Sequence, residues 1–222
     1  MDKKLSWVQP ISTPTLNNEC YKKIKEMILG GLLPWGERLD VGLLASSFGV
    51  SKFPVIKALD RLSQEKLLTI SPNRGTYVTT PHEKDVKEVS EIRIMIEKYA
   101  LKAACGNDIE KLTEKLHAIQ ENFTSEKNDF SSFLQYDRAF HSAIVESVHN
   151  EQLKTYYDSI RTQTELFRTK TFTEGNSNEA LSMHKDILKH LDSKDIDGAI
   201  TALLKHLMQV YKDEISSLEI GQ

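Results

Sequence analysis

The first regular pattern in the chain is a run of apolar residues three or four positions apart, the period of a helix with one buried face. In NNECYKKIKEMILGG, residues 17–31, these positions are Cys20, Ile24, Met27 and Ile28. Asn18 is a candidate N-cap, and Gly30-Gly31 predicts the end of the helix. Residues 1–16 contain two prolines and no such period, so we expect a flexible arm there.

The segment LLASSFGVSKFPVIKAL, residues 43–59, predicts two short helices with a sharp corner between them. Gly49 stops the first helix, and Ser51 is placed to cap a second helix that runs to about Glu65. Ala45, Gly49 and Val55 supply what a helix-turn-helix needs: a small residue, a glycine with positive φ and an aliphatic contact. The start of the second helix is then free to enter a DNA major groove.

Strand-forming residues follow at once in LLTISPNRGTYVTT, residues 67–80. The turn cluster SPNRG separates Leu68 and Ile70 from Tyr77 and Val78, which predicts a β-hairpin with Arg74 at its tip. A hairpin after a helix-turn-helix makes a winged helix-turn-helix, so we expect residues 17–80 to form a DNA-binding domain. The candidate DNA contacts are Ser51, Lys52, Phe53, Lys57, Asn73, Arg74 and Gly75.

Strand signals stop at Pro81, and helical periods occupy the rest of the chain. Turn-forming residues divide this part into six predicted helices, at about 83–104, 108–125, 129–148, 151–170, 176–192 and 195–217. The predicted fold class is therefore mainly α: an N-terminal winged helix-turn-helix domain followed by an all-α six-helix bundle over residues 81–222.

Charge and cysteine content refine this picture. The net charge is −3, but residues 1–80 carry a balance of +4 and the remainder −7, which suggests that the first part contacts a polyanion. Cys20 and Cys105 match no metal or redox spacing, so a reduced, cytoplasmic setting is the simplest interpretation. No apolar run is long enough to span a bilayer or to serve as a signal peptide, so we expect no membrane partner.

Four polar residues lie on apolar helix stripes of the second domain. Asp137 and His141, at i and i+4, share the stripe of Phe133, Phe140 and Ile144; His184 and His206 lie on the stripes of two later helices. Together they can ligate one cation, and the alternative is a purely structural polar core. An N3O set suits zinc, our first choice, and also nickel, manganese, cobalt or iron.

Arg93 falls on the edge of an inward stripe formed by Val89, Ile92 and Ile96. An arginine at such a position needs a partner, and a carboxylate is the best one because it accepts two parallel hydrogen bonds. The partner is either a small carboxylate effector, bound at the open positions of a metal, or Glu97 four residues on. Both interpretations remain open from the sequence.

The motifs G-V-S-x-x-P-V-x-x-A-L-x-x-L from Gly49 and R-G-x-x-V from Arg74 resemble those of the GntR family of bacterial transcription regulators. The helical remainder resembles the FCD ligand-binding domain of the FadR branch, and six helices suggest its VanR-like subgroup. Asp-x-x-x-His from Asp137, followed by two histidines 22 residues apart, is similar to the metal-binding form of that domain.

The resemblance implies a homodimer on a palindromic operator, a small organic acid as effector and a helical domain that binds this effector and mediates dimerisation. The chain departs from the family pattern at three places. Lys52 replaces the usual arginine, Ile56-Lys57 replaces the usual Arg-Glu pair, and Gly42 stands where the family often has an arginine or lysine. Arginine recognises guanine with two hydrogen bonds, so the usual operator of the family is not expected.

The predicted function is a DNA-binding regulator, a repressor, whose operator affinity depends on a carboxylate bound at the metal site. A metal sensor, in which the metal itself is the signal, is the main alternative. An enzyme is not expected, because neither a nucleophile elbow nor an H-E-x-x-H motif occurs. The third interpretation is a protein-interaction module whose helix-turn-helix no longer binds DNA.

Overall fold

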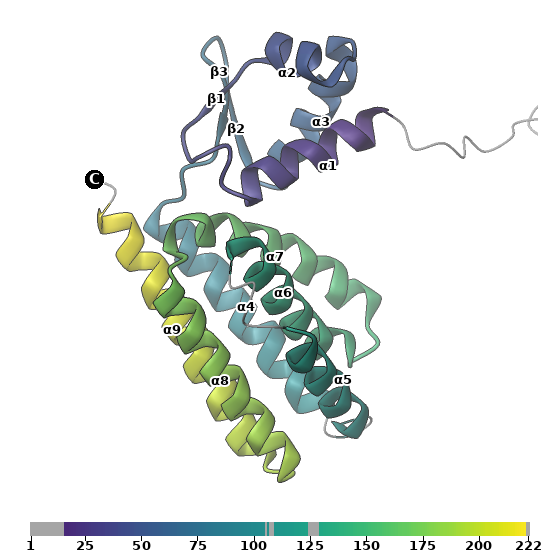
Figure 1. Ribbon diagram of the computed structural model, residues 1–222, viewed down its shortest axis with the longest axis vertical. Coiled ribbons are helices and arrows are strands. Elements are labelled where there is room, and N and C mark those ends of the chain that lie inside the picture. The colour runs from purple at the N-terminus through teal and green to yellow at the C-terminus, as the bar shows by residue number, and fades with distance from the viewer. Residues whose placement is uncertain (1–15, 105, 107–108, 124–128, 221–222) are drawn as a thin grey trace, which may run out of the picture.

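The computed structural model describes residues 16–104, 106, 109–123 and 129–220. In this part of the chain a small N-terminal domain stands on the end of a longer bundle of helices (Figure 1). Of the predicted arm, only Leu16 is described, and it is the first residue of helix α1; residues 1–15 lie outside the described residues.

Helix α1 (Leu16–Leu29) ends where the glycine pair predicts, and Gly31 has a φ of 75°. Cys20, Ile24 and Ile28 are buried as the periodicity requires. The prediction that Asn18 caps the helix is wrong, because the helix already includes Leu16 and Asn18 lies inside it.

The helix-turn-helix is formed by α2 (Val41–Phe48) and α3 (Lys52–Gln64). Asp40 caps α2 by accepting a hydrogen bond from the backbone N–H of Leu43 at 2.9 Å. Gly49 turns the chain in the left-handed region, with φ 66°, and Val55 is fully buried. Ser51 occupies the N-cap position of α3 as predicted, but its side chain makes no capping hydrogen bond.

A three-stranded antiparallel sheet completes this domain, in the order β1-β3-β2. The predicted hairpin consists of β2 (Leu68–Ser71) and β3 (Gly75–Val78). Strand β1 (Arg38–Leu39) was not predicted, because two residues are too few to show alternation. It forms by pairing Arg38 with Tyr77 and Leu39 with Thr76 on β3.

The second part of the described chain contains six helices, which confirms the predicted all-α bundle. They are α4 (Glu83–Ala104), α5 (Ile109–Asn122), α6 (Phe130–Glu146), α7 (Glu151–Thr171), α8 (Glu174–Asp192) and α9 (Ile196–Ile220). Helix α8 begins earlier than predicted, because Thr173 caps it and Gly175 lies inside the helix. No helix among the described residues is both long and apolar enough to cross a membrane.

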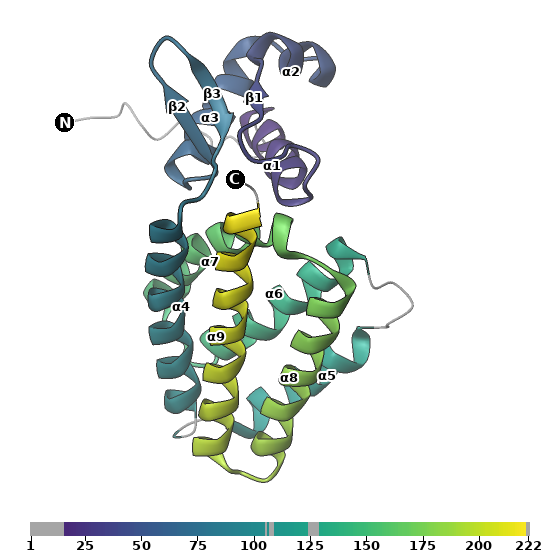
Figure 2. The same cartoon turned by 90° about the vertical axis from the view of Figure 1, so that its left-hand side faces the viewer.

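The two parts of the chain share a hydrophobic core. The core of the N-terminal domain includes Val86 and Val89 of α4 together with Leu166 and Phe167 of α7. The last turns of α9 also pack there, through Ile215 and its neighbours, and Figure 2 shows α9 reaching the base of the wing. The N-terminal domain is therefore packed onto the ends of three helices.

Among the described residues, two hydrogen bonds cross this junction to α7. The indole N–H of Trp35 donates to the carbonyl oxygen of Leu166 at 3.1 Å, and the Lys25 ammonium donates to the Thr162 hydroxyl at 3.2 Å. Lys25 also pairs with Glu65, the C-cap residue of α3, at 2.7 Å. A polar chain thus runs from the end of α3 through α1 to α7.

Replacing Leu62 by alanine should destabilise the N-terminal domain, because Leu62 is fully buried in its core. We expect the free energy of unfolding to fall by about 2–5 kcal/mol. Urea unfolding of the whole chain measures this. Leu32→Ala is the matched control: Leu32 is 76% exposed, and its removal should change stability by less than about 0.5 kcal/mol. Equal effects of the two substitutions would contradict the described core.

Candidate metal centre and nucleic-acid interface

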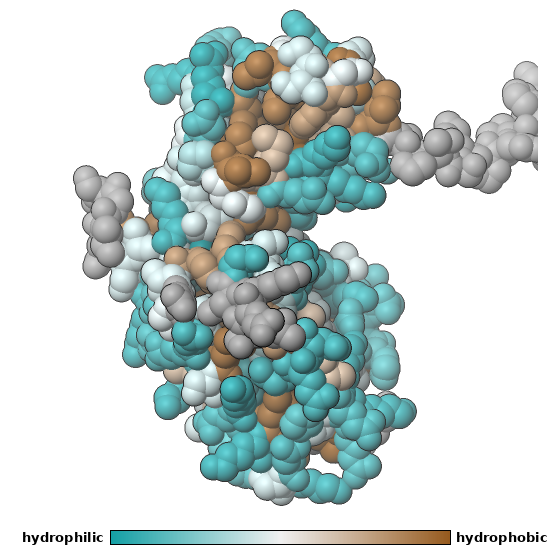
Figure 3. All heavy atoms as spheres, viewed as in Figure 1, coloured by the Kyte–Doolittle hydropathy of each residue, from teal (hydrophilic) through white to brown (hydrophobic). Residues whose placement is uncertain are grey.

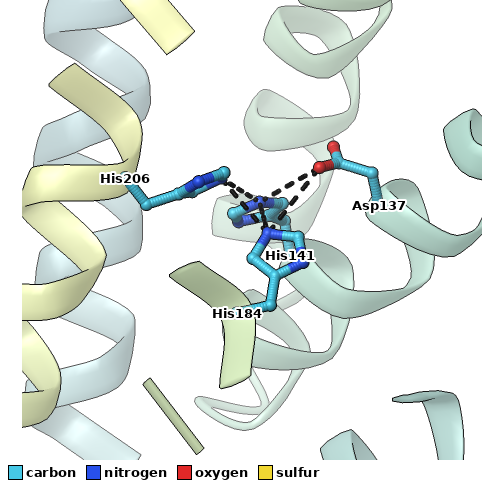
Figure 4. Close-up of side chains that lie close together, drawn as sticks. All are labelled: Asp137, His141, His184 and His206. Atoms are coloured by element: carbon cyan, nitrogen blue, oxygen red, sulfur yellow. Dashed lines mark hydrogen bonds and ion pairs between the residues drawn. The ribbon is translucent and has the colours of Figure 1, made fainter. Parts of the chain in front are cut away.

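Three histidines from three helices meet in the middle of the bundle (Figure 4). The Nε2 atoms of His141 on α6, His184 on α8 and His206 on α9 are 3.1–3.2 Å from one another. An oxygen of Asp137, one turn before His141, lies 3.6 Å from the His141 Nε2 atom and 3.7 Å from that of His184. All four side chains are buried, so the structure brings together the four residues that the sequence singles out.

Neighbouring groups fix the outer nitrogens of two of these rings. The Nδ1 atom of His141 lies 2.7 Å from a carboxylate oxygen of Glu97, which can only accept a hydrogen bond. Tyr136 donates its hydroxyl proton to Gln120, so its oxygen accepts from the His184 Nδ1 atom at 3.0 Å. Both rings then carry a proton on Nδ1, and each neutral ring turns the lone pair of Nε2 toward the cluster.

Two lone pairs at such a separation repel unless a positive charge lies between them. That charge is either a proton or a metal ion. For metal–nitrogen bonds of about 2.0–2.1 Å, two nitrogens on one ion stand roughly 2.8–3.4 Å apart. The observed spacing of 3.1–3.2 Å falls in this range, so the three imidazoles fit a transition metal.

Asp137 offers a fourth ligand atom. One of its oxygens pairs with the guanidinium of Arg168 on α7, and the other is buried with no hydrogen-bond partner within the described part of the chain. A buried carboxylate oxygen without a partner costs free energy, and a cation beside it removes that cost. The unpaired oxygen is the one that faces the histidines.

The charges around the cluster favour metal binding at His184 and Asp137, whereas at His141 they favour a competing proton. Burial, reinforced by the charge of His141, lowers the pKa of His184 well below its usual value, so this ring is neutral. Burial raises the pKa of Asp137, but Arg168 and the histidines outweigh it and hold that pKa well below the ordinary range. Burial lowers the pKa of His141, but the Glu97 carboxylate outweighs it and raises that pKa overall.

Arg93 is buried beside this site and donates to Glu97 at 2.7 Å. The ion pair between Arg93 and Glu97, one of the two partners that the sequence left open for Arg93, is therefore formed. The same Arg93 lines a cavity of about 10 Å³ with Asp137, His141 and Arg168. A second cavity of about 40 Å³ lies beside His206 and Arg168. Both are of water size, so an organic acid would enter only if side chains move.

Three neighbours of the site were not predicted from the sequence: Arg168, Tyr157, and Glu97 as the partner of His141. Tyr157 donates a hydrogen bond to Glu97 at 2.8 Å. The signal for Arg168 was present on α7. Arg161, Glu165 and Arg168 recur at helical spacing beside the buried Tyr157, so charged residues share the inward side of this helix.

The candidate DNA contacts lie on the surface of the N-terminal domain. Ser51, Lys52, Phe53 and Lys57 are exposed at the start of α3. In the turn of the wing, Asn73 and Arg74 are exposed, with Asn73 at a φ of 63°. Gly75 has a φ of 121°, and a Cβ there would lie 3.2 Å from the Arg38 side chain, so glycine is needed for the turn itself.

Comparison with known families agrees with this architecture. Residues 16–78 match the bacterial regulatory proteins of the gntR family, and residues 88–209 match the FCD domain. The chain belongs to the GntR family of regulators with an FCD domain. The predicted DNA-binding transcription regulator is thereby confirmed, and its relatives are regulators rather than enzymes.

Two relatives of this GntR regulator cover most of its length. It is 29% identical to the HTH-type transcriptional regulator YdhC of Bacillus subtilis over 84% of this chain and 85% of YdhC. It is 25% identical to the HTH-type transcriptional repressor RspR of Escherichia coli over 89% of this chain and 88% of RspR.

Two solved structures share the fold. A GntR regulator from Rhodococcus sp. RHA1 superposes with a TM-score of 0.78 at 19% identity, over 90% of this chain and 97% of that one. The Zn²⁺-bound FCD domain of TM0439 superposes with a TM-score of 0.50 at 22% identity, over 63% of this chain and 97% of that one.

Removing two histidines of the cluster should abolish metal binding by this regulator. We expect wild-type protein to hold one transition-metal ion per chain and the double variant His141→Ala/His184→Ala to hold none, because two of four ligands are lost. Elemental analysis with protein quantification measures the ratio. His117→Ala is the matched control, since His117 lies on the surface and pairs with Asp192. Unchanged metal content in the double variant would rule out this site.

Metal affinity should rise with pH through the neutral range. The raised pKa of His141 means that its ring keeps an extra proton up to higher pH, and a metal must displace this proton from Nε2. As pH falls, protonation of the ring competes more strongly with the metal, and the metal dissociates. Titration with Zn²⁺ at several pH values between about 5.5 and 8 gives the affinities. An affinity that stays constant over this range would contradict ligation by histidine.

Proposed function

We propose that this GntR regulator is a metal-dependent repressor whose operator affinity is controlled by a small organic acid. Asp137, His141, His184 and His206 would hold a transition metal, zinc in the first instance, and the acid carboxylate would bind to it. The metal supplies a Lewis-acid attachment point for the carboxylate, and the residues of the chain orient it. One relative named as a repressor and one Zn²⁺-bound FCD domain support this proposal.

The observation that carries the proposal is the combination of ligand atoms and guanidinium groups at one place. The unpaired oxygen of Asp137 and the Nε2 atoms converge there. Arg93 and Arg168 both line the small cavity next to them. A guanidinium is the best partner for a carboxylate, so an acid on the metal would be held from a second side. In this proposal Arg93 and Arg168 together anchor the acid carboxylate.

Helix α7 provides the route from this site to the DNA-binding domain. Arg168 pairs with Asp137 on its inner side, while Leu166 and Thr162 accept the hydrogen bonds of Trp35 and Lys25. An acid that draws Arg168 away from Asp137 would shift α7, and α7 is fastened to α1 and, through Lys25, to the end of α3. Helix α4, which carries Arg93 and follows the wing directly, is a second connection between the site and the winged domain.

We further propose that the regulator acts as a homodimer on a palindromic operator, since two-fold symmetric proteins bind half-sites related by the same axis. Three large apolar residues, Ile92, Met95 and Tyr99, are exposed on one side of α4 and support a self-association surface in the helical domain. Ile92 was predicted to face inward, but it is 40% exposed. Native mass spectrometry of freshly purified protein would report dimer mass, metal and any retained acid together.

The test of the proposed function is a titration of the complex between protein and operator. The operator is first selected from random DNA, and the metal-loaded complex is then exposed to hydroxy-, keto- and sugar acids. An effector should change operator affinity by roughly 5–150-fold. If no acid has an effect but removal of the metal does, the metal-sensor alternative replaces this proposal. If neither has an effect, the regulatory role of the site is wrong.

The double variant Trp35→Phe/Thr162→Val should weaken the coupling without weakening acid binding. It removes both hydrogen bonds to α7. Valine keeps the shape of the threonine side chain, and phenylalanine keeps an aromatic ring at position 35. Because each bond contributes about 0.5–1.5 kcal/mol, the effect of the acid on operator affinity should shrink by about tenfold. Calorimetry measures acid binding, and fluorescence anisotropy measures operator binding.

Thr155→Val is the control for this variant, because Thr155 is an exposed residue of α7 whose hydroxyl bonds within its own helix, at 2.8 Å from the Glu151 carbonyl. It should leave the coupling as in wild type. A double variant with full coupling would show that the signal does not pass through α7.

A further inference from the structure

The side of α3 that faces solvent in its first two turns has an unusual composition for a DNA-binding surface. Pro54, Val55, Ala58 and Leu59 are buried and hold the helix in the domain. The exposed residues are Ser51, Lys52, Phe53, Ile56 and Lys57. Phe53 is 61% exposed and Ile56 is 42% exposed, so two of these five residues are large apolar side chains in contact with water.

None of these five described residues is an arginine, asparagine or glutamine, the planar side chains that bind a base edge with two hydrogen bonds. The next cation along the helix is Arg61, and it is already engaged. Its guanidinium lies 3.7 Å from the ring centroid of Tyr21 on α1 and 3.5 Å from a carboxylate oxygen of Glu65. The exposed start of α3 therefore offers few hydrogen bonds that distinguish one base from another.

An apolar side chain can recognise one feature of the major groove. Of the four bases, only thymine carries a methyl group there, and it is bound by apolar contact. We propose that Phe53 and Ile56 select the operator by contacting thymine methyl groups, while Lys52 and Lys57 hold the DNA through charge. The inference rests on the proposed binding of an operator by α3, and it specifies which chemical group α3 recognises.

The arrangement of charge supports DNA as the occupant of this surface. Lys52 and Lys57 flank the apolar pair, and the Lys57 ammonium lies 5.7 Å from the ring centroid of Phe53. The first turn of α3 contains no acidic residue. Figure 3 shows hydrophobic residues gathered on the N-terminal domain, whereas the surface of the helical bundle in the same view is mostly hydrophilic. An apolar surface bordered by cations fits a thymine-containing groove between phosphates.

The experiment replaces thymine by deoxyuridine, one position at a time, in the selected operator. This change removes the methyl group and keeps base pairing and every hydrogen-bonding atom of the groove. Wild-type protein should lose about fourfold in affinity for each contacted methyl, the usual effect of one buried carbon. Phe53→Ala and Ile56→Ala should bind the thymine operator more weakly, and each should lose the discrimination between thymine and deoxyuridine at its own position.

Leu32→Ala is the control, because it also removes a large exposed apolar side chain from the N-terminal domain but lies outside the helix-turn-helix. It should discriminate like wild type, and thermal melting should confirm that all three variants are folded. Equal binding of both operators by wild type, or discrimination that persists in both α3 variants, overturns the inference alone. A selection that enriches no sequence overturns the proposed operator binding and this inference with it.

Discussion

The ion pair between Asp137 and Arg168 is the contact on which the centre of the helical domain depends. Two charges buried without water cost several kcal/mol each unless they are paired and hydrogen-bonded. Here the pair joins α6 to α7 and leaves one carboxylate oxygen directed at three imidazoles. A second buried pair, Arg93 with Glu97, fixes the orientation of His141. The polar centre therefore positions its own ligand atoms inside the apolar core of the bundle.

Helix α7 belongs both to this centre and to the junction of the two domains. Arg168 is one turn or less from Leu166 and Phe167, which pack in the core of the N-terminal domain. Any movement of the Arg168 guanidinium within the site therefore takes place next to the interface between α7 and the N-terminal domain. Packed helices have few intermediate arrangements, so a small change at such a place can select between two positions of the whole domain.

The sequence was sufficient wherever the determining signal is local. Glycine at positions 30, 31 and 49, together with helical periodicity, placed the helices of the N-terminal domain, and polar residues on apolar stripes identified the histidine cluster. The rest depends on tertiary contacts. Strand β1 exists because Arg38 and Leu39 meet β3 about forty residues later. The partner of Arg93 could not be chosen between Glu97 and a ligand. The pairing of Arg168 with Asp137 could not be predicted, because the carboxylate is on another helix.

The shared hydrophobic core has a consequence for modularity. Exchanging the winged domain for that of another family member would have to reproduce the surface that covers Leu166, Phe167 and Val89. A chimera joined only at the linker before α4 would leave these side chains in water or against mismatched neighbours. The unit that can be transplanted intact is the winged domain together with the turns of α4, α7 and α9 that pack against it. A boundary that preserves this packing therefore cuts across helices.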